Sequence, residues 1–204
     1  MTLRLMTAAL SLGLLTATSA WAAPTVGQPA PAFRALDTRG QPVQLSDFRG
    51  KHVVLEWVNP GCPFVRKHYS GNMQATQQSA TDRGVVWLTI SSTEPASADY
   101  KKPADLGAWM ASQKARATAT LMDDDGKVGR AYGARTTPHM YVIDPKGTLV
   151  YAGAIDSRPT ARVSDIEGAT NYVRQALDEL LAGKPVSTPV TQAYGCSIKY
   201  MNAG

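Results

Sequence analysis

The sequence predicts an α/β protein in which a central mixed β-sheet is flanked by helices in a three-layer sandwich. Short apolar runs rich in β-branched residues alternate with segments of helical character along the chain, a pattern typical of a sheet with crossover helices. Two largely apolar runs, 53–58 and 85–90, have the character of buried parallel strands. The run 140–143 is followed by a tight turn and a returning strand at 148–152, so part of the sheet is expected to be antiparallel.

The N-terminal segment 1–22 has the features of a secretory signal peptide. Arg4 precedes an apolar run, 5–18, and a site of small residues follows, which is the usual order in a signal peptide. We place cleavage after Ala22. Because the run is too short for a good membrane span, we expect a periplasmic or secreted protein with no stable membrane insertion. Retention of the segment as an anchor is the alternative.

Removal of residues 1–22 leaves 182 of the 204 residues, which suits one globular domain. We assign 23–185 to this domain and 186–204 to a C-terminal tail. The formal net charge of the whole chain is +5. Its basic residues are scattered rather than clustered, so the sequence offers no stripe of the kind that nucleic acid needs.

The domain is predicted to begin with an extended arm and a β-hairpin. Prolines and glycines interrupt residues 24–32 and favour the arm. Residues 33–36 and 42–45 form the two strands of the hairpin, joined by a longer loop. A turn or one-turn helix follows at 46–50.

The first central strand leads directly to one of the two cysteines. Asn59-Pro60-Gly61 ends the strand at 53–58, and Cys62-Pro63 follows. Because proline is well placed in the first turn of a helix, we predict a helix from there to about Ser79. Cys62 then lies at a helix N-terminus, where the helix dipole and the free N–H groups favour thiolate over thiol.

The remaining elements follow from periodicity and turn residues. The last helix carries apolar residues at helical spacing over four turns and ends at Gly183 and Pro185. We place this last helix at 166–181. Between the second central strand and this helix we predict a polar loop at 91–103, helices at 104–115 and 127–132, and a strand at 121–122.

This order of elements, with a cysteine at a helix start and Thr-Pro before a strand, resembles the thioredoxin fold over residues 25–182. The motifs 29–33 and 45–51 resemble the redoxin branch, which groups alkyl hydroperoxide reductase/thiol-specific antioxidant (AhpC/TSA) proteins with exported thiol–disulfide oxidoreductases. The resemblance implies a thioredoxin-like sandwich with an N-terminal β-hairpin extension and a C-terminal tail.

The resemblance also implies roles for Cys62, Pro138 and Glu56, and two neighbouring residues are predicted to contact substrate. Cys62 matches the attacking cysteine, and Pro138 matches the cis-proline that faces it. The Thr137 backbone would pair with an extended partner peptide, and Pro63 beside the cysteine is expected to contact substrate. Glu56 matches a buried acid that exchanges protons with a sulfur; its alternative is a strand-end glutamate that faces solvent.

Departures from the family patterns decide between two activities. Val65 occupies the position of the second cysteine of a Cys-x-x-Cys motif, so Cys62 has no local resolving partner. Asn59 and Leu55 stand where peroxiredoxins carry Thr or Ser and Pro, and Pro138 stands where they carry an activating Arg. These differences favour thiol–disulfide exchange over a peroxidase.

Cys196 is the only other cysteine and lies on the tail. Two cysteines in an exported protein can form one disulfide, either structural or redox-active. Tails that supply a resolving cysteine occur in this superfamily, so Cys196 is expected to resolve a mixed disulfide on Cys62. A static link that holds the tail is the alternative.

Metal binding is a weaker hypothesis. His68 and His139, with Met140 and Cys62, include imidazole and thiolate groups that suit copper, but Met140 opens a strand and an isolated histidine is more often structural. We therefore predict no metal site. The acidic stretch 123–126 is expected to be a turn.

The sequence thus predicts an exported thiol–disulfide oxidoreductase that needs no cofactor beyond its redox-active thiols. Its expected partners are protein or small-molecule thiols and disulfides, together with a redox partner protein. A thiol peroxidase that uses the same cysteines on a hydroperoxide is the first alternative. A non-catalytic binding or copper-handling module with a structural disulfide is the second.

Overall fold

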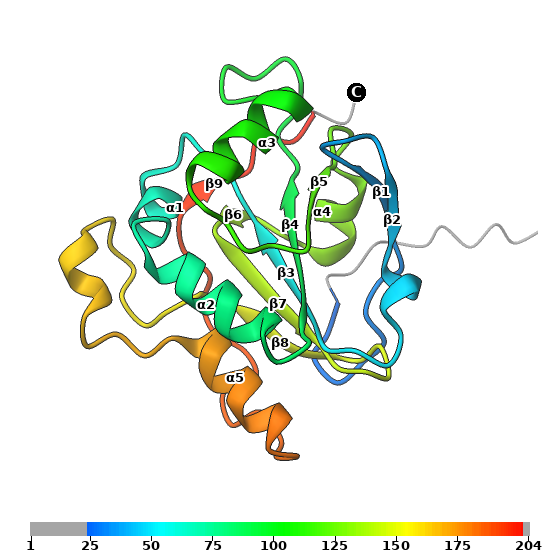
Figure 1. The fold of residues 1–204 in the computed structure, drawn as a ribbon, viewed down its shortest axis with the longest axis vertical. Coiled ribbons are helices and arrows are strands. Elements are labelled where there is room, and N and C mark those ends of the chain that lie inside the picture. Colours follow the sequence, from blue (N-terminus) through cyan, green and yellow to red (C-terminus); the bar gives the residue numbers. More distant parts are fainter. Residues whose placement is uncertain (1–23, 202–204) are drawn as a thin grey trace, which may run out of the picture.

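The computed structural model describes residues 24–201, so the predicted signal peptide lies outside the described residues. A seven-stranded sheet in the order β2-β1-β5-β4-β3-β7-β8 forms the centre of the molecule (Figure 1). Its strands are β1 (Arg34–Asp37), β2 (Pro42–Gln44), β3 (Val53–Trp57), β4 (Val86–Ser91), β5 (Ala119–Met122), β7 (His139–Ile143) and β8 (Leu149–Gly153).

The sheet is mixed, as the sequence predicts. β3 pairs with β4, and β4 with β5, in parallel. β7 and β8 add antiparallel strands on the other side of β3, and the β1–β2 hairpin adds antiparallel strands beyond β5. β3 therefore lies inside the sheet, and its last residues deliver the chain to the Cys62 turn.

Helices cover both faces of the sheet. They are α1 (Pro63–His68), α2 (Asn72–Thr81), α3 (Pro103–Ser112), α4 (Lys127–Tyr132) and α5 (Tyr172–Leu181), with short 3-10 helices η1 (Leu45–Phe48) and η2 (Val163–Ile166). α1, α2, α3 and α5 pack on one face, whereas α4 and the N-terminal arm pack on the other. No helix between residues 24 and 201 is long and apolar enough to cross a membrane.

Alternation along β3 divides the core into two clusters. Val54 and Val58 contribute to the cluster under α1, α2, α3 and α5. Leu55 and Trp57 contribute to the cluster under α4. This alternation is the period of two expected of a strand buried on both faces, and it places Glu56 on the same face as Val54.

Two predicted helices are wrong in extent. The helix predicted from Cys62 to about Ser79 is two helices, because Gly71 adopts φ +135° between α1 and α2, a conformation that side-chain-bearing residues rarely adopt. The helix predicted at 166–181 begins only at Tyr172. The Asn171 side chain accepts a hydrogen bond from the Arg174 N–H there and so caps the true start.

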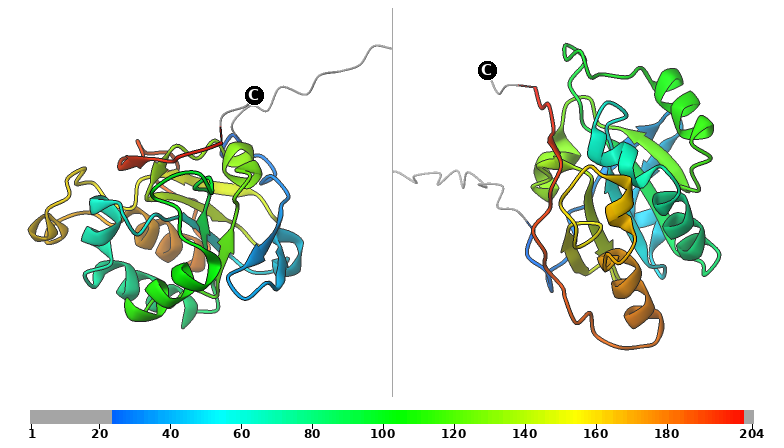
Figure 2. Two further views of the ribbon diagram at one scale, coloured as in Figure 1. Left: turned by 90° about the horizontal axis from the view of Figure 1, so that it is seen from above. Right: turned by 90° about the vertical axis from the view of Figure 1, so that its left-hand side faces the viewer.

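The C-terminal tail is an ordered part of the described structure. After α5 it runs along the edge of the molecule towards α1 (Figure 2). Val190 bridges to Ala152 on the outer edge of β8. Further on, β9 (Cys196–Ser197) pairs with β6 (Thr136–Thr137) in a separate two-stranded sheet. The tail is thereby carried past the N-terminus of α1.

Candidate active site

Cys62 occupies the N-cap position of α1, with Pro63 directly after it in the first turn. The turn before it is closed by the Asn59 side chain, whose Oδ1 accepts a hydrogen bond from the Gly61 N–H at 2.8 Å. The Cys62 side chain is only 2% exposed, whereas Pro63 is exposed. The predicted position of the cysteine at a helix start is therefore confirmed.

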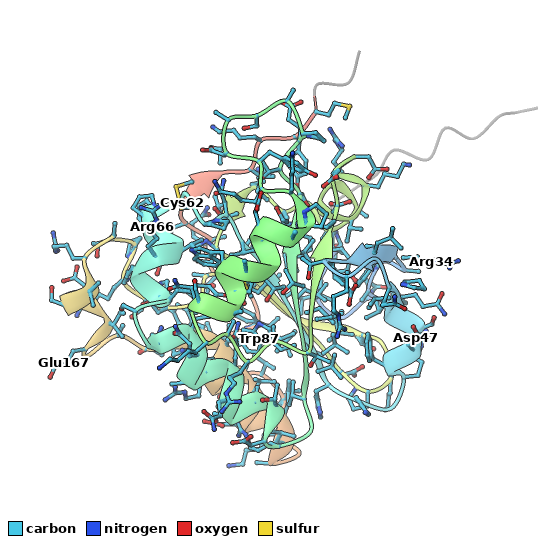
Figure 3. All side chains as sticks on the ribbon, turned by 45° about the horizontal axis from the view of Figure 1, so that its top comes forward. Arg34, Asp47, Cys62, Arg66, Trp87 and Glu167 are labelled. Carbon is cyan, nitrogen blue, oxygen red and sulfur yellow. A yellow bond between two sulfur atoms is a disulfide. The ribbon has the colours of Figure 1, made fainter. Side chains whose placement is uncertain are left out.

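Cys62 and Cys196 form a disulfide, with their Cα atoms 5.9 Å apart. Cys62 lies at the start of α1, close to β9 and to Arg66 (Figure 3). Cys196 is only partly buried, so it is the more exposed residue of the pair. The structure joins a helix-start cysteine to a tail cysteine 134 residues away in sequence.

Thr137 lies against the disulfide, and Pro138 follows it directly. Their peptide bond is cis, as the resemblance implies, and both residues are buried. The Thr137 carbonyl oxygen lies 3.1 Å from the Cys62 Sγ. The Thr137 hydroxyl is buried without a hydrogen-bond partner. The resemblance implies a Thr137 backbone that is free for a partner peptide, but here Thr137 pairs with Cys196 of the chain's own tail.

Gly195 allows this close approach of the tail. It adopts φ +139°, and a Cβ added to it would lie 2.0 Å from the Thr137 carbonyl oxygen. Its hydrogen side chain is therefore required both by the backbone conformation and by the contact. Beyond the cysteine, the Ile198 N–H donates to the Arg135 carbonyl at 3.0 Å, so the tail is held on both sides of Cys196.

Glu56 is fully buried on the face of the sheet that carries α1 and α2, so it does not face solvent. Its carboxylate accepts hydrogen bonds from four side chains, none of which is Cys62. The donors are the Tyr69 hydroxyl at 2.8 Å, the Gln77 amide at 3.0 Å, the Trp87 indole at 2.7 Å and the Thr89 hydroxyl at 3.3 Å. Burial raises the pKa of Glu56, against the opposing effect of these hydrogen bonds.

A buried polar cluster that the sequence did not predict lies under the tail. Lys67 and His68 of α1 face Asp156, which follows β8, and all three are at most 2% exposed. The Lys67 ammonium lies 3.3 Å from the Asp156 carboxylate. Burial lowers the pKa of His68 to about 4, with a further lowering by Lys67 and an opposing effect of Asp156. Tyr194 donates a hydrogen bond to Asp156.

One signal for this cluster is present in the sequence. Asp156 directly follows the apolar run 149–155, and an acidic residue in such a position needs a partner if it is buried. Lys67 is 89 residues away along the chain. Only the packing of α1 against the end of β8 identifies it as the partner.

The hydrogen bonds of the two histidines are made with groups other than Cys62. His68 contacts Asn72 and Tyr194, while the His139 Nδ1 accepts a hydrogen bond from the Arg135 N–H at 3.3 Å. Burial lowers the pKa of His139 to about 4, with a smaller contribution from the Arg135 charge. Among residues 24–201 no group of three or more His, Cys, Asp or Glu is arranged to hold a metal ion.

Comparisons with known proteins agree with this architecture. The model of the AhpC/TSA family matches residues 26–152. No curated protein matches the chain. An uncharacterized conserved protein from Geobacillus kaustophilus is 27% identical with a TM-score of 0.76, and the match covers 88% of this chain and 94% of that one.

Two further solved structures are also similar. A hypothetical protein from Sinorhizobium meliloti 1021 is 26% identical with a TM-score of 0.75, over 90% of this chain and 98% of that one. The thioredoxin domain of a thiol-disulfide oxidoreductase from Bacteroides vulgatus is 26% identical with a TM-score of 0.52, over 71% of this chain and 97% of that one. The predicted thioredoxin-like fold is thereby confirmed.

Proposed function

The chain belongs to the AhpC/TSA family, and on that premise we propose that it is an exported thiol–disulfide oxidoreductase with Cys62 and Cys196 as its redox pair. The observation that carries the proposal is the disulfide itself, which joins a helix-capping cysteine to a partly accessible tail cysteine beside a cis-proline. The segment 1–22 supports export, as does the disulfide, which persists in oxidising compartments.

In the first half-reaction the reduced protein transfers two electrons to a substrate disulfide. When the tail is undocked, the Cys62 thiolate attacks one substrate sulfur and expels the other as a thiolate, so that a mixed disulfide forms. The Cys196 thiolate then attacks the Cys62 sulfur, closes the Cys62–Cys196 bond and releases the second substrate thiolate. Glu56 is the proposed proton acceptor, and Thr137, Pro138 and Pro63 are the proposed substrate contacts.

The second half-reaction begins at the other sulfur. Cys62 is 2% exposed and covered by the tail, whereas Cys196 is partly exposed. An incoming thiolate from a redox partner therefore reaches Cys196 first and forms a mixed disulfide there. Cys62 leaves as a thiolate at the start of α1, a position that stabilises negative charge. A second partner thiolate then releases Cys196.

Thiol exchange is tested with glutathione. The reduced protein is mixed with oxidised glutathione, quenched with acid and analysed by mass, alongside Cys62→Ser and Cys196→Ser. We expect rapid formation of the internal disulfide in the parent protein and a persistent glutathione adduct on Cys62 in Cys196→Ser. Failure of the parent to react would contradict the proposal. A reduction potential below about −300 mV would favour a structural link over a redox pair.

Peroxide reduction is the second candidate, favoured by the family match over residues 26–152. Asn59 closes the turn before Cys62 and so is committed to backbone support. Arg66 donates its Nε–H to the Pro60 carbonyl at 2.8 Å. Both side chains thus support the backbone of the turn, which argues against a role of either in binding peroxide. Stopped-flow mixing of the reduced protein with hydrogen peroxide distinguishes the two activities, because rapid peroxide consumption would support the peroxidase and contradict the exchange function.

A further inference from the structure

Tyr194 lies two residues before Cys196 and inserts its side chain among residues of the domain. Its ring packs edge-to-face on Phe64 of α1, with ring centroids 5.8 Å apart, and the Lys67 ammonium lies 5.7 Å from the centre of the same ring. Its hydroxyl donates a hydrogen bond to Asp156 and lies 3.1 Å from the His68 Nε2. A tail residue thus completes a cluster that is otherwise built by α1 and the end of β8.

The hydrogen bonds of this cluster all lead to the Asp156 carboxylate as the final acceptor. The Asn72 amide lies 2.8 Å from the His68 Nδ1 and, as the donor of that pair, leaves the proton of a neutral imidazole on Nε2. The Nε2–H therefore donates to the Tyr194 oxygen, and the Tyr194 hydroxyl donates to Asp156. The other oxygen of Asp156 accepts from Lys67 at 3.3 Å.

Undocking of the tail would disturb this arrangement. Departure of Tyr194 removes a donor from the buried Asp156 carboxylate and an acceptor from the buried His68 ring. A hydrogen bond to a charged group such as the Asp156 carboxylate stabilises a structure more than a bond between neutral groups does. The cluster therefore favours the docked tail whether or not the two sulfurs are bonded.

We propose that Tyr194 is a positioning residue whose hydroxyl keeps the tail docked when the Cys62–Cys196 bond is open. Cys196 then stays beside Cys62, and the closing of the disulfide becomes a reaction between groups already in place. Its importance for catalysis rests on the proposed exchange function, whereas the docking itself does not.

The test uses Cys196→Ser protein, in which no internal disulfide can form and the docked tail covers Cys62. The rate of Cys62 alkylation by iodoacetamide then reports how often the tail leaves. Because a hydrogen bond to a charged group is lost, we expect Tyr194→Phe in this background to raise the rate by at least about tenfold. Phenylalanine keeps the ring contacts with Phe64 and Lys67.

Tyr132→Phe is the matched control. It removes another largely buried hydroxyl, which donates its hydrogen bond to the Pro31 carbonyl at 2.7 Å and not to the tail. We expect no change in alkylation with this variant. A protein that ends at Val186 gives the rate for a fully absent tail. If this shortened protein does not fold, limited proteolysis provides the second measurement. We then expect a protease to cleave the tail faster in Tyr194→Phe than in the protein that keeps Tyr194.

The outcomes separate the two proposals. Equal alkylation rates with and without the Tyr194 hydroxyl, or an equal increase in Tyr132→Phe, would overturn the positioning role. Faster alkylation in Tyr194→Phe, together with a parent protein that does not react with oxidised glutathione, would support the positioning role and contradict the exchange function.

Discussion

Thr137 and Cys196 are paired residues of neighbouring antiparallel strands, and the Thr137 carbonyl oxygen also lies 3.1 Å from the Cys62 sulfur. The chain's own tail thus occupies the backbone edge at which the resemblance places an extended substrate. An extended peptide can pair with Thr137 only after β9 has left. A small thiol, in contrast, can approach the partly exposed Cys196 while the tail stays docked.

The Gly195 contact provides a direct test of this tail position. Gly195→Ala places a Cβ against the Thr137 carbonyl oxygen, where only 2.0 Å is available. We expect the β6–β9 pairing to be lost and the equilibrium constant for the Cys62–Cys196 disulfide, obtained from the oxidised fraction in a glutathione redox buffer, to fall at least about tenfold, because Cys196 loses its fixed position. The fraction is measured by acid quench and alkylation.

Gly183→Ala is the control for backbone strain. Gly183 also has positive φ, +71°, but an added Cβ there would meet nothing within 4 Å. The Gly183→Ala substitution should therefore lower stability slightly without changing the oxidised fraction. An equal shift of the disulfide equilibrium in both variants would mean that strain, rather than the Thr137 contact, causes the effect.

Lys67 is predicted to be important for stability through its charge. Lys67→Met leaves the buried Asp156 carboxylate without its cation, and loss of one partner of a buried ion pair typically costs about 3–5 kcal/mol. We expect a lower free energy of unfolding in urea, and substantial recovery when Asp156→Asn is added. Lys101→Met, at an exposed position, should have little effect. A double variant no more stable than Lys67→Met alone would argue against the ion pair.

Stability should fall as the medium is acidified. His68 has a folded-state pKa of about 4, below its ordinary value of 6.5, so the unfolded chain binds a proton that the folded protein does not between these values. The contribution of His68 is thus complete above pH 6.5 and is lost as pH falls towards 4, by at most about 1.4 kcal/mol per pH unit. Urea unfolding at pH 7.5 and 4.5 measures it.

His68→Gln should reduce this acid sensitivity, because glutamine does not titrate. His139→Gln should do the same, since the pKa of His139 is also lowered to about 4. Comparison of each variant with the parent at both pH values removes the contributions of other groups. An unchanged difference between pH 7.5 and 4.5 in His68→Gln would contradict the prediction.

Titration of Glu56 should make stability depend on pH in the opposite sense, with stability falling as pH rises. Its pKa is raised above the ordinary value of 4.5, so the folded protein retains a proton that the unfolded chain has lost, and the stabilising effect is lost as pH rises through the folded-state pKa. Glu56→Gln removes this dependence but presents an amide to four donors. We therefore expect the variant to be less stable than the parent at pH 5, with a smaller difference at pH 8.

Glu167→Gln, at an exposed position, is the matched control for the change from carboxyl to amide. If Glu56 also accepts a proton during exchange, the pH profile of the reaction with oxidised glutathione should change in Glu56→Gln and remain unchanged in Glu167→Gln. A parallel shift of stability at pH 5 and pH 8 in Glu56→Gln would contradict the raised pKa.

The local signals in the sequence were sufficient for most of the fold. The hairpin, the central strands and the α4 helix follow from alternation, apolar runs and turn residues, which act over a few neighbouring positions. The errors occurred where one residue interrupts a longer pattern. Gly71 ends the helical course between α1 and α2, and Asn171 caps α5, although apolar spacing continues past both positions.

At the site, the helix-start position of Cys62, the acid in β3 and the Thr137-Pro138 motif could be predicted from the sequence, because each is local to one strand or turn. The residues that contact them depend on the tertiary fold. The pairing of Cys62 with Cys196 was expected because the sequence holds only two cysteines, but the occupied Thr137 edge and the Tyr194 cluster were not, and they join segments far apart in the chain. Their contacts depend on how α1, β8 and the tail pack, which no local pattern encodes.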